Sequence, residues 1–127
     1  TTESIAEAIA ERSCIRIVPY GDQAAYLMGF TSIQIGRYTY LTDGAPRVIH
    51  CNNTTITFNH TSEVRIFSFM NRTMQLLSLA IRAVGKEGMT PEIRAIAAEQ
   101  IMKVPRAEFQ EDIKLCPGWV ADIILDL

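Results

Sequence analysis

The two histidines of the sequence, His50 and His60, are the side chains best suited to acid and base chemistry. In the hairpin that residues 47–58 are expected to form, His50 lies beside Thr55 on the polar face, where an imidazole could serve as a general base. A catalytic triad also needs a nucleophile and a carboxylate that orients the base. Neither stands near His50 in the sequence, so we interpret it as a solvated strand histidine.

Acidic residues offer two further candidate sites. Asp22 and Asp43 adjoin glycines and could bind a metal ion, but Asp-Gly is also the common chemistry of a tight turn, which is the interpretation we prefer. Glu108, Glu111 and Asp112 could work together as an acid and a base. Their positions around apolar residues are instead typical of the solvated face of a helix. The sequence therefore predicts no acidic catalytic site.

Cysteine and glycine patterns add no site either. Cys14, Cys51 and Cys116 are far apart and lack the spacing of metal ligands, so each is expected to be a small buried hydrophobe. The chain contains no dinucleotide fingerprint, phosphate-binding loop or zinc-protease motif. Trp119 is expected to anchor the core and not to stack on a nucleobase. The residues thus disclose no enzyme site, and neither a cofactor nor a metal is expected.

Residues 38–58 are the stretch around which the other elements are expected to be organised. Three β-rich runs are separated by Asp43-Gly44 and Asn52-Asn53, which suit tight turns, so a three-stranded antiparallel meander is predicted. If Asn52-Asn53 is a two-residue turn, the register of the second hairpin follows. It pairs Arg47 with Phe58, Val48 with Thr57, Ile49 with Ile56, His50 with Thr55 and Cys51 with Thr54. One face is then apolar and needs helices to cover it.

Most of the remaining segments have helical patterns. Helices are expected over residues 4–12 from a Ser4/Glu7 capping box, over 22–28 after Asp22, over 71–85, over 91–102, around 109–113, and from 117 onward. The helix that Asn71 caps has the broadest apolar side, so we expect it to cover the sheet. Residues 63–67 alternate and are read as a strand. The residues expected to be buried are Ile49, Ile56, Phe58, Leu77, Ile81 and Trp119.

Length and composition set the wider limits. At 127 residues, 14.2 kDa and 48% hydrophobic content, residues 1–127 are expected to form one domain of the α/β (α+β) class, with a small mainly antiparallel sheet packed against several helices. The 12 basic and 14 acidic residues are interspersed, which disfavours nucleic-acid binding by this segment. Neither a long apolar run nor a leader is seen, so a cytoplasmic location is expected.

Several blocks together carry a family resemblance. They are Ser4-Ile-Ala-Glu-Ala-Ile-Ala-Glu-Arg12, Ile15-Arg-Ile-Val-Pro-Tyr-Gly21, Ala24-Ala25 with Leu27-Met-Gly29, Tyr40-Leu-Thr-Asp-Gly44 with Arg47, and Pro117-Gly-Trp-Val-Ala-Asp122. In these blocks the chain resembles the C-terminal domain of AbiEi-like antitoxins, a group of bacterial proteins. The likeness covers nearly the whole chain.

The resemblance implies a regulatory role. AbiEi-like proteins are antitoxins of type IV toxin–antitoxin systems and autoregulating transcription factors, and their toxin is a nucleotidyltransferase. Their DNA contacts belong to an N-terminal winged helix-turn-helix, which is expected to precede this domain in the full-length protein. The expected function is therefore interaction and not catalysis. The alternative is a small enzyme, such as a degenerate nuclease-like domain, which needs clustered acids and a lysine in one cleft.

The turn region of residues 39–47 is the surface that we expect to be functional. It contains Tyr40, Asp43 and Arg47 of the block that carries the resemblance, and His50 follows on the next strand. A plainer interpretation stays open, in which Tyr-Leu-Thr-Asp-Gly only marks the central turn of the fold.

Overall fold

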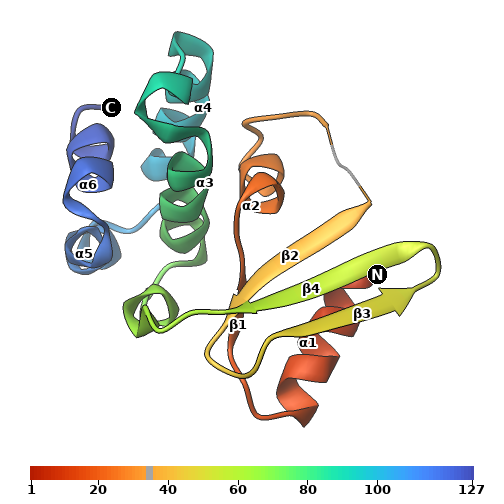
Figure 1. The fold of residues 1–127 in the computed structure, drawn as a ribbon. Helices are drawn as coiled ribbons and strands as arrows, with labels where there is room; N and C mark the ends of the chain where they lie inside the picture. The colour runs from red at the N-terminus through yellow and green to blue at the C-terminus, as the bar shows by residue number, and fades with distance from the viewer. Residues whose placement is uncertain (34–35) are drawn as a thin grey trace.

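The computed structural model describes residues 1–33 and 36–127, and its described part is a mixed α and β fold, as predicted (Figure 1). Its elements in chain order are α1 (Thr2–Arg12), β1 (Ile17–Pro19), α2 (Asp22–Leu27), β2 (Arg37–Thr42), β3 (Arg47–Cys51), β4 (Thr54–His60), the 3-10 helix η1 (Val64–Phe67), α3 (Arg72–Gly88), α4 (Pro91–Met102), α5 (Arg106–Asp112), the 3-10 helix η2 (Ile113–Leu115) and α6 (Gly118–Leu125).

The second hairpin has the predicted register. β3 and β4 run antiparallel, with Ile49 opposite Ile56 and His50 opposite Thr55. Asn52 and Asn53 form the turn with φ angles of 48° and 62°, in the left-handed region that asparagine tolerates better than most residues. Turn chemistry and alternation were thus sufficient to place each side chain of this hairpin on its face of the sheet.

The predicted meander, however, is wrong in its strand order. The sheet has the order β1-β2-β4-β3, so β4 lies between β2 and β3 and runs parallel to β2. This pairing puts Tyr40 beside Phe58, with their rings edge to face and 5.8 Å between centroids. The residues after Asp43 do not form a tight hairpin but carry the chain to the outer side of β4. Turn-forming residues specify a reversal of the chain, but they do not choose the neighbouring strand.

Helix α1, and not α3, covers the apolar face of the sheet (Figure 1). Ala6 of α1 is fully buried in a cluster with Tyr40, Ile56 and Phe58. The small alanine lets the helix approach the strands closely. The expectation that the helix of residues 71–85 covers this face is therefore wrong, because α1 packs its apolar residues Ile5, Ala6 and Ile9 on this face.

Helix α3 forms the centre of a second layer, together with α2, α4 and α6. Its Met74, Leu77 and Ile81 are completely buried, and they share a core with Val18 of β1. Asn71 caps the helix as predicted, and the backbone leaves helical geometry at Gly85, where the sequence predicted the end. This layer contacts the sheet through α2 on β2 and α3 on β1. The outer face of β3 and β4 stays open, with Val48 58% exposed.

Several local expectations also need correction. Helix α1 starts at Thr2 with Thr1 as its cap, because the Thr1 hydroxyl accepts from the Ser4 amide, so the Ser4 capping box does not form. Residues 64–67 are a 3-10 helix and not a strand. Among the residues expected to be buried, Ile49 and Trp119 are half-buried and the other four are buried. Of the three cysteines, Cys116 is buried, Cys51 is half-buried and Cys14 is exposed.

Candidate functional site

Asp43 of the predicted surface is bound to another part of the fold. The Arg16 amide donates to Asp43 Oδ1 and Arg16 Nε donates to Oδ2, both at 2.8 Å. These hydrogen bonds, first from the side chain and then from the backbone, hold the pKa of Asp43 below its ordinary value. The Arg16 guanidinium also lies 5.0 Å from the ring centroid of Phe67. Asp43 therefore joins the β2–β3 connection to β1.

The neighbours of Asp43 in the turn have structural contacts as well. Thr42 is fully buried, and its hydroxyl accepts from the Gly44 amide at 3.0 Å. His60 Nδ1 donates to the Gly44 carbonyl at 2.8 Å. A Cβ atom at Gly44 would lie only 2.5 Å from Ile15 Cγ2, so glycine is required there by close packing. Each of these residues has a structural reason to be in the turn.

The structure does not bring the four predicted site residues together. Tyr40 is 2% exposed and lies beneath α1. Arg47 donates to the Ser13 hydroxyl at 3.5 Å, on the same side of the sheet as α1. His50 alternates with Arg47 along β3 and lies on the open face, where its Nδ1 is 3.4 Å from Thr55 Oγ1. Asp43, Arg47, Tyr40 and His50 thus occupy separate environments.

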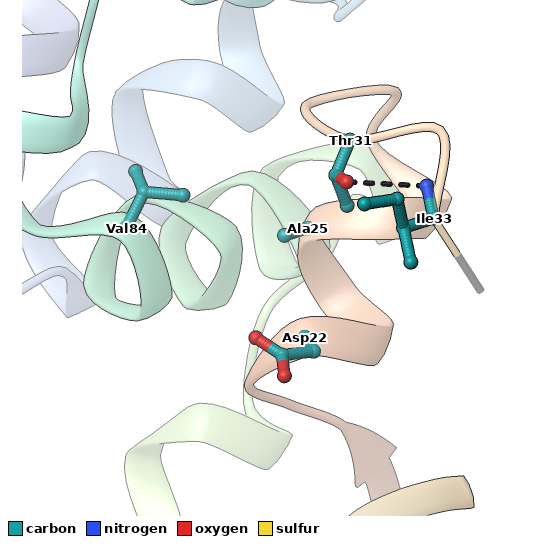
Figure 2. Close-up of a pocket in the computed structure, with 5 residues that line it drawn as sticks. All are labelled: Asp22, Ala25, Thr31, Ile33 and Val84. Atoms are coloured by element: carbon teal, nitrogen blue, oxygen red, sulfur yellow. Dashed lines mark hydrogen bonds between the residues drawn. The ribbon is translucent and has the colours of Figure 1, made fainter. Parts of the chain in front are cut away.

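A hollowed surface surrounds the turn between β1 and α2, which sequence reasoning did not single out as a site. Three hollows of about 270 Å³ each border this turn, the third sharing Asp22 with the first and Tyr20 and Gly21 with the second, and together we call them the β1–α2 groove. The first hollow is lined by Asp22, Ala25, Thr31, Ile33 and Val84 (Figure 2). The second is lined by Tyr20, Gly21, Leu41, Leu79, Arg82 and Ala83. The third is lined by Tyr20, Gly21, Asp22, Gln23, Arg37 and Thr39.

The turn at the centre of the groove is held firmly by β2 and β4. The Tyr20 amide donates to the Thr39 carbonyl at 3.2 Å, and the Thr39 hydroxyl donates to the Tyr20 carbonyl at 3.0 Å. Asn59 of β4 donates its side-chain amide to the Tyr20 hydroxyl. Gly21, with φ of 62°, then turns the chain into α2, which begins at Asp22 without a side-chain cap. The groove is therefore built on the sheet and not on a free loop.

Charges of both signs line the β1–α2 groove. Asp22 and Arg37 are exposed, and within residues 1–33 and 36–127 neither belongs to an ion pair. Arg82, by contrast, forms an ion pair with Glu63, with 2.6 Å between Arg82 Nη1 and Glu63 Oε2. Asp22 and Arg37 are thus available to pair with charges of a partner, since a free surface ion loses little when it exchanges water for an opposite charge.

Two neighbouring polar side chains are buried, Gln23, which lines the third hollow, and Tyr40, which lies in the cluster beneath α1. Gln23 is 7% exposed and Tyr40 is 2% exposed, and their polar atoms have no hydrogen bond of regular geometry in the described part of the chain. Burial raises the pKa of the Tyr40 hydroxyl, and the nearby Gln23 amide opposes part of that rise. The two side chains therefore lie close to one another at the end of the sheet.

Of the three acids that the sequence offered as an acid–base group, Glu108 and Asp112 both accept hydrogen bonds from Asn71, whereas Glu111 pairs with Lys114 on the surface. Asp112, expected on a solvated helix face with Glu108 and Glu111, is instead fully buried, and its two oxygens accept from the Met70 and Asn71 amides at 2.8 and 2.9 Å. Among the described residues, no three His, Cys, Asp or Glu side chains gather as metal ligands. In the same residues, no helix has the length and apolar character needed to cross a bilayer.

One signal in the sequence pointed to the groove. Pro19 and Gly21 end a strand inside one of the blocks that carry the resemblance, and the charged residue Asp22 follows directly after that block. Local patterns in this segment predict only a turn and the start of a helix. The opposite walls, from Arg37 on β2 and Leu79 on α3, come from distant parts of the chain and could not be assigned to it from local patterns.

Comparison with known proteins gives one match. The model of a protein family described as a family of unknown function (DUF6088) matches residues 1–113, nearly nine-tenths of the chain. Neither the curated proteins nor the solved structures include a match.

Proposed function

We propose that this chain, which belongs to the family of unknown function DUF6088, is the C-terminal regulatory domain of an AbiEi-like type IV antitoxin and transcriptional regulator that acts by binding a partner. The sequence blocks that resemble AbiEi-like antitoxins support the antitoxin part of this proposal. The observation that supports binding is the β1–α2 groove, in which Asp22 and Arg37 lie exposed beside apolar hollows.

A groove of this composition suits a protein partner. Protein interfaces combine an apolar centre with a polar rim, and charges at the rim select the partner. The groove provides apolar walls from Leu41, Leu79 and Val84, with Asp22 and Arg37 at its openings. In the full-length protein that the resemblance implies, the N-terminal domain contacts DNA. The domain of residues 1–127 then transmits or receives the regulatory signal, and the nucleotidyltransferase toxin is its functional counterpart.

The proposal is tested by co-expressing the full-length protein with the nucleotidyltransferase encoded beside it in a bacterial host and measuring growth and promoter repression. The wild-type protein is expected to restore growth. The variant Arg37→Glu is expected to lose this rescue without a change in Tm, because Arg37 is exposed in the groove. The matched control, Arg72→Glu, changes an exposed arginine at the start of α3 and is expected to rescue like the wild type.

Two outcomes contradict the proposal. Absence of rescue and of repression by the wild-type protein rejects the antitoxin and regulator role. Turnover of nucleic acid or another substrate by the purified chain, lost on mutation of its acids, supports the enzyme alternative instead. Full rescue by Arg37→Glu leaves the antitoxin role standing but places the functional surface outside the groove.

A further inference from the structure

Two of the three hollows in the β1–α2 groove are mainly apolar. In the first hollow, the side chains of Ile33 and Val84 stand on opposite sides of Ala25 (Figure 2). Ile33 is 71% exposed, so this wall is open to a partner. In the second hollow, Leu41 and Leu79 face the space beside Tyr20. Both hollows offer apolar surface that a partner could remove from water.

Asp22 lines the first hollow and also the third, which adjoins the second through Tyr20 and Gly21. Its carboxylate extends from the first turn of α2 at the edge of the first hollow (Figure 2), and the preceding residue, Gly21, lines the second. The side chain is exposed, and no cation pairs with it anywhere in residues 1–33 and 36–127. A negative charge beside two apolar surfaces favours a partner that carries a positive group flanked by two apolar groups.

We infer that the β1–α2 groove binds an extended segment of a partner protein that presents two apolar side chains with a lysine or arginine between them. This inference rests on the proposed function and specifies the chemistry of its partner. The hollows, at about 270 Å³ each, lie below the range of about 300–1,000 Å³ that is usual for small-molecule pockets. A hollow of this size can hold one apolar side chain, and neighbouring hollows can hold successive side chains of one segment.

An extended conformation presents the three side chains in the required order. Alternate residues of an extended chain point to the same side, so positions i, i+2 and i+4 can enter the first hollow, approach Asp22 and enter the second hollow. The backbone of such a segment lies over the Gly21–Asp22 turn, where Gly21 presents no side chain and a Cβ placed there would meet Thr39 Oγ1 at 3.9 Å. Leucine at i and i+4 with lysine at i+2 is the simplest sequence of this kind.

The experiment is a titration of the ¹⁵N-labelled chain with the synthetic peptide acetyl-Gly-Leu-Ser-Lys-Ser-Leu-Gly-amide, followed by amide chemical shifts. We expect saturable shifts at Gly21, Asp22, Ala83 and Val84, with peptide concentrations up to about 5 mM so that a Kd of about 1 mM is detected. Peptides with glutamate in place of lysine, or serine in place of both leucines, are the chemical controls and are expected to bind at least about fivefold more weakly.

Protein variants separate the charge of Asp22 from other effects. Asp22→Asn keeps the shape of the side chain. We expect it to weaken binding of the lysine peptide about five- to tenfold, so that the lysine peptide no longer binds more tightly than the glutamate peptide. Asp122→Asn, an exposed acid on α6 outside the groove, is the matched control and is expected to bind like the wild type. Tm measurements on both variants show that folding is intact.

The inference is overturned by the absence of saturable shifts, by shifts outside the groove, or by equal binding of the lysine and glutamate peptides. Groove shifts that change on dilution of the protein alone overturn it too, because a second copy of this chain is then the occupant. The outcome is independent of growth rescue. Peptide binding without rescue rejects the antitoxin role alone, and rescue without peptide binding rejects only this partner chemistry.

Discussion

Asp43 accepts two hydrogen bonds from one residue, Arg16, which lies 27 positions earlier in the chain. Because one donor is the backbone amide and the other is Nε, the pair fixes both the main chain before β1 and the arginine side chain, which then covers Phe67. The most recognisable turn in the sequence therefore ties three segments together. If a substitution of Asp43 abolishes function, the stability of that variant must also be measured, because unfolding has the same effect as loss of a functional group.

The Asp43 carboxylate is expected to stabilise the fold only when it is ionised. Its pKa is lowered in the folded state by Arg16, so the stabilisation is complete above the ordinary value of 3.8 and is lost as the pH falls through the folded value. Asp43→Asn is expected to cost ~1 kcal/mol at neutral pH. The difference in Tm from the wild type is expected to shrink below about pH 4. Asp122→Asn serves as control, and a difference that stays constant with pH contradicts the assignment.

Gly44→Ala is expected to destabilise the protein by ~1–3 kcal/mol, because its new methyl group would lie 2.5 Å from Ile15 Cγ2 and force the turn apart. Gly118→Ala is the control, since a Cβ there would meet no atom within 4 Å from the described residues beyond its chain neighbours and its own helix backbone, and the residue starts α6. It is expected to be neutral or slightly stabilising. Chemical denaturation of both variants measures the difference, and equal stability would mean that the turn relaxes freely.

Asp112→Ala is expected to cost ~3 kcal/mol, because it leaves the Met70 and Asn71 amides without their buried acceptor and removes the link from α5 to the start of α3. Its neighbour Glu111 is exposed and forms a surface ion pair with Lys114. Glu111→Ala is therefore expected to change stability by less than ~0.5 kcal/mol. Thermal unfolding compares the two. A small effect at Asp112 would show that water replaces the carboxylate at these amides.

Cys14→Gly is expected to stabilise the protein by ~1 kcal/mol. Cys14 has a φ of 55°, in the left-handed region where a Cβ atom is unfavourable, and its side chain is exposed, so little packing is lost. The reverse change, Gly29→Ala, introduces a Cβ at a φ of 81° and is expected to cost a similar amount. Opposite shifts in Tm support this explanation, and a loss of stability in Cys14→Gly would show that the thiol has a packing role.

Local chemistry was enough to predict many elements of the fold. The two asparagines at 52 and 53 specified the β3–β4 hairpin and its register, and Thr90-Pro91 and Asn71 marked the starts of two helices. Gly29 and Gly85 marked the ends of helical geometry in α2 and α3, since each has the positive φ that glycine adopts at low cost. These features depend on interactions between residues a few positions apart, which the order of residue types specifies directly.

The partner of each element was decided only by the tertiary structure. The sequence did not distinguish whether β2 pairs with β3 or β4, or whether α1 or α3 covers the sheet, because several apolar faces of similar size compete for the same surface. The place of the β1–α2 groove was also decided by tertiary packing, since its walls come from β1, α2, β2 and α3. Residue types alone therefore determined the elements and the turns, whereas packing between distant segments decided the sheet order, the burial of Tyr40 and Asp112, and the place of the groove.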